Sequence, residues 1–145
     1  MIDDAQQTNV AEVLRRLNEL YAEETEAAVR YLHLASTVKG LDRAAVKQTM
    51  LDGHVETLEH AQRIAEKIIQ LGGKPNLKVR LDLDGSLISG ADAIRTALAF
   101  EQAALDAYKE LLELAGNDVV LQEFVRAQIA LESQHVSSLY LLLDN

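Results

Sequence analysis

The sequence has no cysteine and no tryptophan, only one proline, and only 4% aromatic residues. The lack of cysteine excludes a disulfide framework, a thiolate metal site and a cysteine nucleophile. One proline and seven glycines leave long stretches without a helix breaker, and the strong helix formers Leu and Ala supply 24 and 20 residues. The composition therefore favours an all-α fold and excludes an all-β one.

Basic residues are also scarce, with 14 Lys and Arg against 23 Asp and Glu, for a formal net charge of -9. Phosphate backbones and anionic membranes repel such a chain, so we expect no nucleic-acid and no membrane partner, whereas cations are attracted. No run approaches the ~18 apolar residues of a membrane helix, and the N-terminal MIDDAQQTNVAE lacks the basic and apolar regions of a secretion signal. We therefore expect a cytoplasmic protein.

The length of 145 residues, 48% of them hydrophobic, suits a single domain over residues 1–145. Apart from Gly53, the glycines and the proline separate four segments whose apolar residues recur at helical spacing. Residues typical of helix ends flank these segments, with Asp118 before the last and Gly116 after the third. We predict helices from Thr8 or Asn9 to Lys39, from about Leu41 to Gly72-Gly73, from just after Ser89-Gly90 to Gly116, and from Asn117-Asp118 almost to Asn145.

The connection between the second and third helices, about residues 73–89, is far longer than the other two. Short connections make the first and last helix pairs antiparallel hairpins, whereas a long one lets the middle two helices run parallel. Within this connection VRLDLDG alternates as a strand does, but a lone strand has no partner, so we predict an extended loop. The expected fold is a four-helix bundle of antiparallel hairpins with one long crossover between helices 2 and 3.

The two halves of the sequence share a repeated pattern. The spacing E-x-x-A-x-x-x-Y occurs in the first helix from Glu24 to Tyr31 and in the third helix from Glu101 to Tyr108. Each tyrosine lies about two turns along the same face as its glutamate, where its phenol can hydrogen-bond a carboxylate. Two similar hairpins packed face to face would bring these groups together.

The second and fourth helices each carry a histidine at a matching place, because His60 follows Glu24 by 36 residues and His135 follows Glu101 by 34. On the last helix, Glu132 and His135 form an E-x-x-H pair on one face. Taken singly, each of these residues is more typical of a solvated helix surface. Together, a Glu or His at matched depth on each of four helices favours a carboxylate-bridged two-metal site, and such ligands suit iron or manganese, with iron favoured by availability.

The second helix departs from this pattern. Three residues before His60 stands Thr57, where a glutamate would complete a second E-x-x-H pair. Glu56 could reach the site from the other side of the apolar stripe, whereas Glu59 points about 100° away from His60 and is expected to be solvated. The remaining histidines, His33 and His54, have no matching partners and are expected to be exposed.

The sequence resembles the ferritin-like superfamily, and within it the bacterioferritins, over about Leu14 to Leu143. The resemblance is carried by LNELYAEETEAAVRYLHLA, by HAQRIAEKIIQLGGKPNL, and by Glu101 and Glu132-x-x-His135 in register. It implies a two-iron centre. The metal ligands that it implies are Glu24 and Glu101 as terminal carboxylates, His60 and His135 as imidazoles, and Glu132 as a bridge.

Three departures from the bacterioferritin pattern bear on function. The second bridging position falls on Thr57, so either Glu56 swings in, or fewer metals bind, or the site is a degenerate copy. The haem-ligating Met of the family falls on Leu58, so we predict no haem. The chain stops ten residues after His135, whereas bacterioferritins continue into a short fifth helix. A dimer, a 12-subunit shell and a variant subunit beside a related chain are therefore all open, with a homo-oligomer expected.

The resemblance implies an iron-binding protein that oxidises Fe(II) with dioxygen or peroxide, a ferroxidase-type oxidoreductase serving iron storage or detoxification. One alternative keeps the fold but makes the protein a two-metal oxygenase or peroxidase for a small organic substrate, which requires an apolar pocket beside the metals. Another is a non-catalytic subunit with a degenerate site. A structural bundle without any metal would require the internal repeat to be a coincidence.

Overall fold

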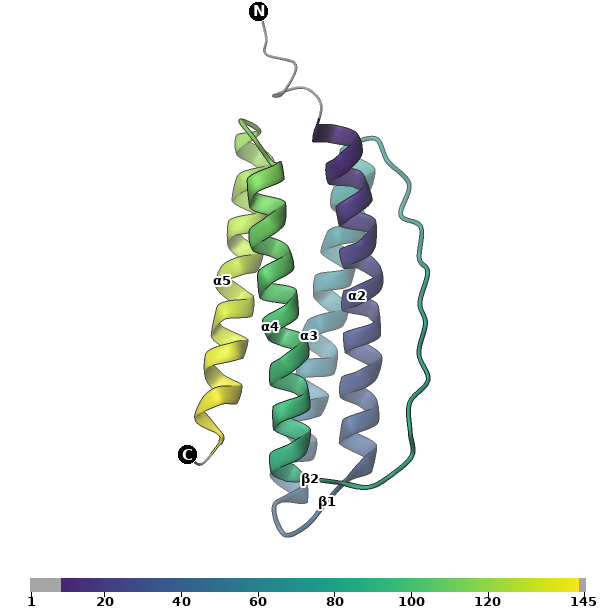
Figure 1. The fold of residues 1–145 in the computed structure, drawn as a ribbon, viewed down its shortest axis with the longest axis vertical. Helices are drawn as coiled ribbons and strands as arrows, with labels where there is room; N and C mark the ends of the chain where they lie inside the picture. The colour runs from purple at the N-terminus through teal and green to yellow at the C-terminus, as the bar shows by residue number, and fades with distance from the viewer. Residues whose placement is uncertain (1–8, 144–145) are drawn as a thin grey trace, which may run out of the picture.

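The computed structural model describes residues 9–143, most of which lie in four long helices (Figure 1). The predicted helix limits at Thr8 and Asn145 lie outside the described residues. The elements are α2 (Asn9–Thr37), β1 (Val38–Lys39), α3 (Arg43–Gln70), β2 (Ile88–Ser89), α4 (Gly90–Leu114) and α5 (Val119–Leu141).

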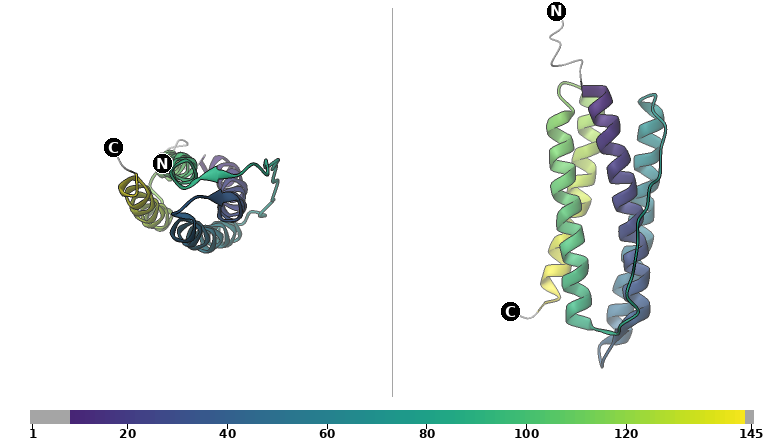
Figure 2. Two further views of the ribbon diagram at one scale, coloured as in Figure 1. Left: turned by 90° about the horizontal axis from the view of Figure 1, so that it is seen from below. Right: turned by 45° about the vertical axis from the view of Figure 1, so that its right-hand side comes forward.

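The helices form two antiparallel hairpins joined by a long crossover. Helix α2 packs against α3 and α4 against α5, and α2 also contacts α4 (Figure 2). The crossover leaves the end of α3 and returns along α2 to the opposite end of the bundle, where α4 begins (Figure 1). Helices α3 and α4 therefore run parallel, and the predicted all-α bundle with one crossover is confirmed.

Gly116 and Asp118, predicted to end one helix and begin the next, lie in the turn between α4 and α5. Gly116 has a φ of 56°, the left-handed conformation that glycine adopts without a steric penalty. The Asp118 side chain then accepts a hydrogen bond from the Leu121 backbone N–H at 3.0 Å and caps α5. At the start of α4, the Ser89 hydroxyl accepts from the Asp92 N–H in the same way.

The first predicted helix is two residues too long, and the crossover is not entirely a loop. Val38–Lys39 leaves the helix and pairs in parallel with Ile88–Ser89, so each segment supplies the backbone partner that the other needs. A pairing between residues about fifty positions apart has no local signal, because neither segment is long enough to show strand alternation. The stretch VRLDLDG is a loop, as predicted.

The crossover is fastened to α2 by side chains about two turns apart. Asn18 accepts a hydrogen bond from the Asn76 N–H at 2.7 Å, and Glu26 accepts from the Arg80 N–H at 3.0 Å. His33 Nε2 lies 2.6 Å from the carbonyl oxygen of Asp84, to which it donates. The expectation that His33 is exposed is therefore wrong, because the crossover half-buries its ring.

Two apolar clusters fill the bundle, one near each end. The cluster near the α4–α5 turn contains Val13, Leu17, Leu20, Ile64, Ile68, Ala104, Ala107, Tyr108, Leu111, Ala115, Leu121 and Val125. The cluster near the α2–α3 turn contains Tyr31, Leu34, Ala35, Val38, Val46, Met50, Ala93, Ile94, Ala97 and Leu139. Among the residues that the structure describes, no helix is both long enough and apolar enough to cross a bilayer.

Candidate metal centre

A layer of buried polar side chains separates the two apolar clusters. Every long helix contributes to it, and each member has at most 3% of its surface exposed. Burying so many polar groups in one place costs free energy unless they bind one another or a ligand. We define this central polar layer as Glu24 from α2, Thr57 and His60 from α3, Glu101 from α4, and Gln128 and Glu132 from α5.

Glu24, His60 and Glu132 form one group whose ligand atoms all lie within 4.8 Å of one another. His60 Nδ1 is 3.1 Å from a Glu24 oxygen and 3.0 Å from a Glu132 oxygen. These residues come from three different helices, so only the assembled bundle brings them together. Two carboxylates converging on one imidazole nitrogen could hold a divalent cation.

Glu101, Glu132 and His135 form a second group of the same kind. His135 Nδ1 lies 3.6 Å from a Glu101 oxygen. The rings of His60 and His135 stack with their centroids 5.5 Å apart. Because Glu132 belongs to both groups, its carboxylate is shared by the two candidate metal positions, as the family resemblance implies for a bridge.

The two tyrosines of the repeat bond to the glutamates across the bundle. The Tyr31 hydroxyl on α2 donates to Glu101 on α4 at 2.7 Å, and the Tyr108 hydroxyl on α4 contacts Glu24 on α2 at 3.4 Å. The prediction that these phenols reach carboxylates is met, but each tyrosine serves the glutamate of the other hairpin. Sequence reasoning missed Gln128, whose amide lies 3.5 Å from the Tyr108 hydroxyl, because a single Gln on an apolar helix carries no spacing signal.

Gly53 fixes the position of the Tyr31 ring. A Cβ at residue 53 would lie 2.5 Å from Cε1 of that ring, closer than atoms in contact can come. The glycine therefore lets the Tyr31 ring lie directly on the backbone of α3. The Phe100 ring packs edge-on against the Tyr31 ring, with the two ring centroids 4.8 Å apart. This explains a glycine in a helix interior, where Ala would be favoured by about 1 kcal/mol.

The carboxyl groups of the layer differ in the direction in which their pKa values are shifted. Burial raises the pKa of Glu132 and of Glu24, so without a cation each favours its neutral form. Burial acts on Glu101 in the same sense, but the neighbouring His135 imidazole, the Glu132 carboxyl and the Tyr31 hydroxyl outweigh it and lower the Glu101 pKa to about 2. The nearby Glu101 carboxylate, together with that of Glu56, raises the pKa of His135. A bound divalent cation would stabilise all three carboxylates in their charged form.

The layer also contains buried oxygens with nothing to bind. Oε2 of Glu101, Oε2 of Glu132 and Oγ1 of Thr57 have no hydrogen-bond partner. An unpartnered buried oxygen is costly, and a cation beside the two carboxylates would remove that cost for them. The oxygen and imidazole donors present here therefore fit iron or manganese.

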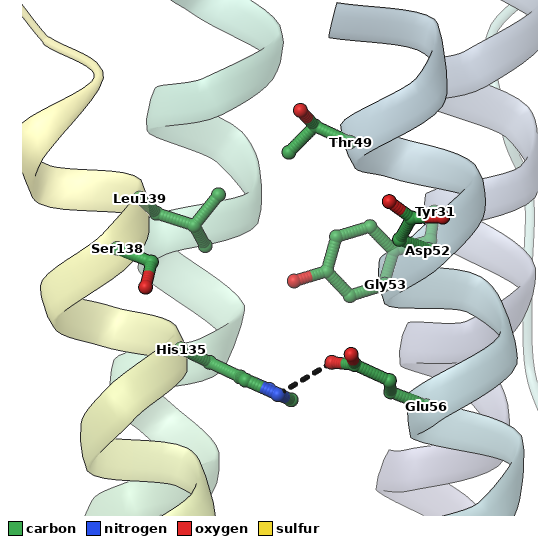
Figure 3. Close-up of a pocket in the computed structure, with 8 residues that line it drawn as sticks. All are labelled: Tyr31, Thr49, Asp52, Gly53, Glu56, His135, Ser138 and Leu139. Carbon is green, nitrogen blue, oxygen red and sulfur yellow. Dashed lines mark ion pairs between the residues drawn. The ribbon is translucent and has the colours of Figure 1, made fainter.

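Glu56 lies outside both groups. Its carboxylate is 2.6 Å from His135 Nε2, the ring nitrogen opposite the one that faces Glu101, and 51% of its side chain is exposed (Figure 3). In this position it can hold the His135 ring in place through the far nitrogen, as carboxylates do for metal-bound histidines. Direct metal binding by Glu56 stays a prediction. Glu59 is exposed, as expected.

A pocket of about 210 Å³ opens beside His135, between α3 and α5. Six of its eight lining residues have polar side chains, and the Glu56–His135 pair spans it (Figure 3). A second pocket, of about 150 Å³, reaches Glu24 between α2 and α4. The pocket between α3 and α5 is lined by Tyr31, Thr49, Asp52, Gly53, Glu56, His135, Ser138 and Leu139.

Two further residues from the sequence analysis lie away from the layer. His54 was expected to be exposed, but it is half-buried and its Nδ1 donates to the Ala28 carbonyl of α2 at 2.7 Å, so this expectation is wrong. Leu58 is 41% exposed on α3, and the absence of haem stays a prediction.

Solved structures with this arrangement of helices include three with at least a quarter of their residues identical. A ferritin-like diiron-carboxylate protein from Bacillus anthracis str. Ames is 29% identical over 94% of this chain and 98% of that one, with a TM-score of 0.83. The dodecameric thioferritin of Bacteroides fragilis is 26% identical over 94% and 88%, with a TM-score of 0.81. A bacterioferritin from Rhodobacter capsulatus is 25% identical over 90% and 82%, with a TM-score of 0.76.

A search of the curated proteins finds no match. The model of one protein family, described as the ferritin-like domain, matches residues 14–145 and so includes every residue of the central polar layer. The buried carboxylates, the crossover topology and this match agree, and the chain belongs to the ferritin-like family.

Proposed function

We propose that the protein binds two Fe(II) ions in the central polar layer and oxidises them with dioxygen or peroxide, for iron storage or detoxification. The observation that supports this most directly is the pair of three-residue groups sharing Glu132. The diiron-carboxylate protein of Bacillus anthracis, similar over nearly its whole length, supports the same reading. Manganese is the alternative metal, since it accepts the same ligands.

In this proposal the ligands are Glu24 and His60 for one ion, Glu101 and His135 for the other, and Glu132 between them. Dioxygen would accept one electron from each Fe(II) and, with two protons, leave as hydrogen peroxide. If hydrogen peroxide is the oxidant, the same two electrons and two protons would convert it to two molecules of water. Holding both ions in one buried site makes the two-electron step possible without a second encounter.

The residues around the ligands would keep the carboxylates ionised and oriented. The Tyr31 hydroxyl donates to Glu101, and burial raises the pKa of both tyrosines, so they stay protonated donors. Glu56, at the far nitrogen of His135, would orient that ring toward Glu101. Both roles are positional.

The pockets favour ions over an apolar substrate. The pocket between α3 and α5 presents Asp52 and Glu56, and the one between α2 and α4 presents Glu23 and Glu26 near Glu24. Acidic groups around a pocket raise the local concentration of cations. A two-metal oxygenase would instead need an apolar pocket beside the metals, and the carboxylates at both pockets support the binding of cations more directly.

We also infer a homo-oligomer. Apolar side chains with more than half of their surface exposed include Val119 and Val120 at the start of α5 and Leu141 and Leu142 at its end. Side chains of this kind commonly lie in subunit contacts. The related thioferritin of Bacteroides fragilis is described as dodecameric. A native mass of one chain would contradict this inference. The cytoplasmic location stays a prediction from the sequence.

The deciding experiment is the amount of metal bound per chain, measured by elemental analysis after anaerobic loading with Fe(II) and removal of loose ions. The proposal expects two irons per chain and their oxidation on admission of dioxygen or peroxide. Almost no bound metal would instead favour the non-catalytic subunit with a degenerate site.

A further inference from the structure

The centre is built with approximate twofold symmetry, except at one position. Glu132 and His135 on α5 are three residues apart, and Thr57 and His60 on α3 are three residues apart. Both histidines contact carboxylates of the layer, and their rings stack. Thr57 is therefore the counterpart of Glu132, and like it is 1% exposed.

Thr57 cannot do what Glu132 does. A hydroxyl carries no charge, whereas Glu132 offers one carboxylate to both groups. The Thr57 Oγ1 atom is buried and has no hydrogen-bond partner, so a donor inside the layer is unused. Leaving such a group unpaired costs free energy. A ligand that accepts a hydrogen bond from the Thr57 hydroxyl would remove this cost.

The charge balance of a loaded centre points to an anion. Two divalent cations carry a charge of +4, and three buried carboxylates, Glu24, Glu101 and Glu132, supply −3. The histidines bind metals as neutral rings. One positive charge would then be buried without compensation, which is unfavourable in an apolar surrounding.

Glu56 is poorly placed to supply the missing charge. It adjoins Thr57 in the sequence, so it points about 100° away around the helix. Its carboxylate already pairs with His135 Nε2 at 2.6 Å, on the far side of the ring from Glu101. Swinging inward would break that pair and bury a half-exposed side chain.

We propose that the centre, once it holds two divalent metals, binds one small monovalent carboxylate such as formate or acetate beside Thr57. This inference rests on the proposed two-metal function. The Thr57 hydroxyl donates to one carboxylate oxygen, and the anion supplies the charge that Glu132 supplies on the other side.

The test uses the whole protein loaded anaerobically with Co(II), whose visible absorption reports changes in its ligands. Two Co(II) per chain are first confirmed by elemental analysis. Formate is then titrated in a buffer free of carboxylates, by absorption and by calorimetry. We expect saturable binding of one formate per chain, and no saturable binding to the metal-free protein.

Three variants locate the site. Thr57→Val keeps the shape but removes the donor, so formate should bind about tenfold more weakly. Thr57→Glu supplies a resident carboxylate and should abolish formate binding while retaining two Co(II). The matched control is Thr49→Val on the same helix, which lines the pocket and whose hydroxyl bonds its own helix at Ala45. It should bind formate as the unchanged protein does.

The outcomes separate the two proposals. Two Co(II) per chain without saturable formate binding would overturn the anion site and leave the metal centre standing. A fourth variant, Glu56→Gln, removes the other carboxylate that could complete the centre. Formate binding that appears only in this variant would also overturn the anion site, because Glu56 would then be supplying the missing charge. Formate binding equally strong in Thr57→Val and Thr57→Glu would place the anion elsewhere. Fewer than two metals per chain would overturn the proposed function and the anion site with it.

Discussion

The Tyr31 ring lies on the backbone of α3 at Gly53, at a distance that leaves no room for a Cβ atom. From there its hydroxyl reaches Glu101 on α4, 2.7 Å away. A residue on the second helix therefore sets the position of a carboxylate on the third through a side chain of the first.

Gly53→Ala should destabilise the protein, by about 1–3 kcal/mol, because the added methyl group forces the Tyr31 ring out of place. The intrinsic helix preference of Ala works in the other direction by about 1 kcal/mol. In a Tyr31→Ala background the clash is gone, so the same change should stabilise. Urea unfolding of the four proteins in this cycle measures both signs. The same sign in both backgrounds would contradict the proposed contact.

Glu132→Ala should abolish binding of two metals, because both candidate groups lose their shared carboxylate. Glu59→Ala, on the exposed surface of α3, is the control and should keep full occupancy. Elemental analysis after anaerobic Fe(II) loading gives the count for each. Equal metal binding by the two variants would mean that the ligand assignment is wrong.

Tyr31→Phe should weaken metal binding about tenfold, because Glu101 loses a hydrogen bond to its charged form while the ring stays in place. Tyr140→Phe removes a hydroxyl from an exposed ring on α5 and should change nothing. Competition with a coloured chelator measures both affinities. An unchanged affinity in Tyr31→Phe would show that Glu101 does not depend on this donor.

The stability of the metal-free protein should fall as the pH rises from about 5 to 8. Burial raises the pKa of Glu132 and Glu24 above the ordinary value of 4.5, so each favours folding below that pH and loses its contribution as the pH climbs. The raised pKa of His135 acts in the same sense. The lowered pKa of Glu101 acts oppositely, but that contribution is already complete above about pH 5.

Thermal unfolding across this pH range, with and without metal, checks the prediction. One retained proton changes the free energy of unfolding by up to about 1.4 kcal/mol per pH unit. Bound cations keep the carboxylates charged, so the loaded protein should show a flatter profile. Glu132→Gln cannot titrate at that position and should flatten the profile of the metal-free protein. A metal-free protein that gains stability with pH would contradict the account.

Local features of the sequence were enough to predict the helices, their order and their directions. Apolar spacing, the scarcity of proline, the turn at Gly116 and the cap at Asp118 are local signals, and the unequal connection lengths then imply the crossover. The internal repeat also brought Glu24, Glu101, His60 and His135 into one prediction, because similar hairpins packed face to face align equivalent positions.

Which side chains meet could be read only from the packed bundle. Four features depend on contacts between different elements. They are the Tyr31–Glu101 hydrogen bond, the sharing of Glu132 by both groups, the Glu56–His135 pair and the contact of His33 with the crossover. Helical periodicity tells which face of a helix is buried, but it carries no information on the rotation of that helix against a distant one. Those contacts follow from packing the whole bundle at once.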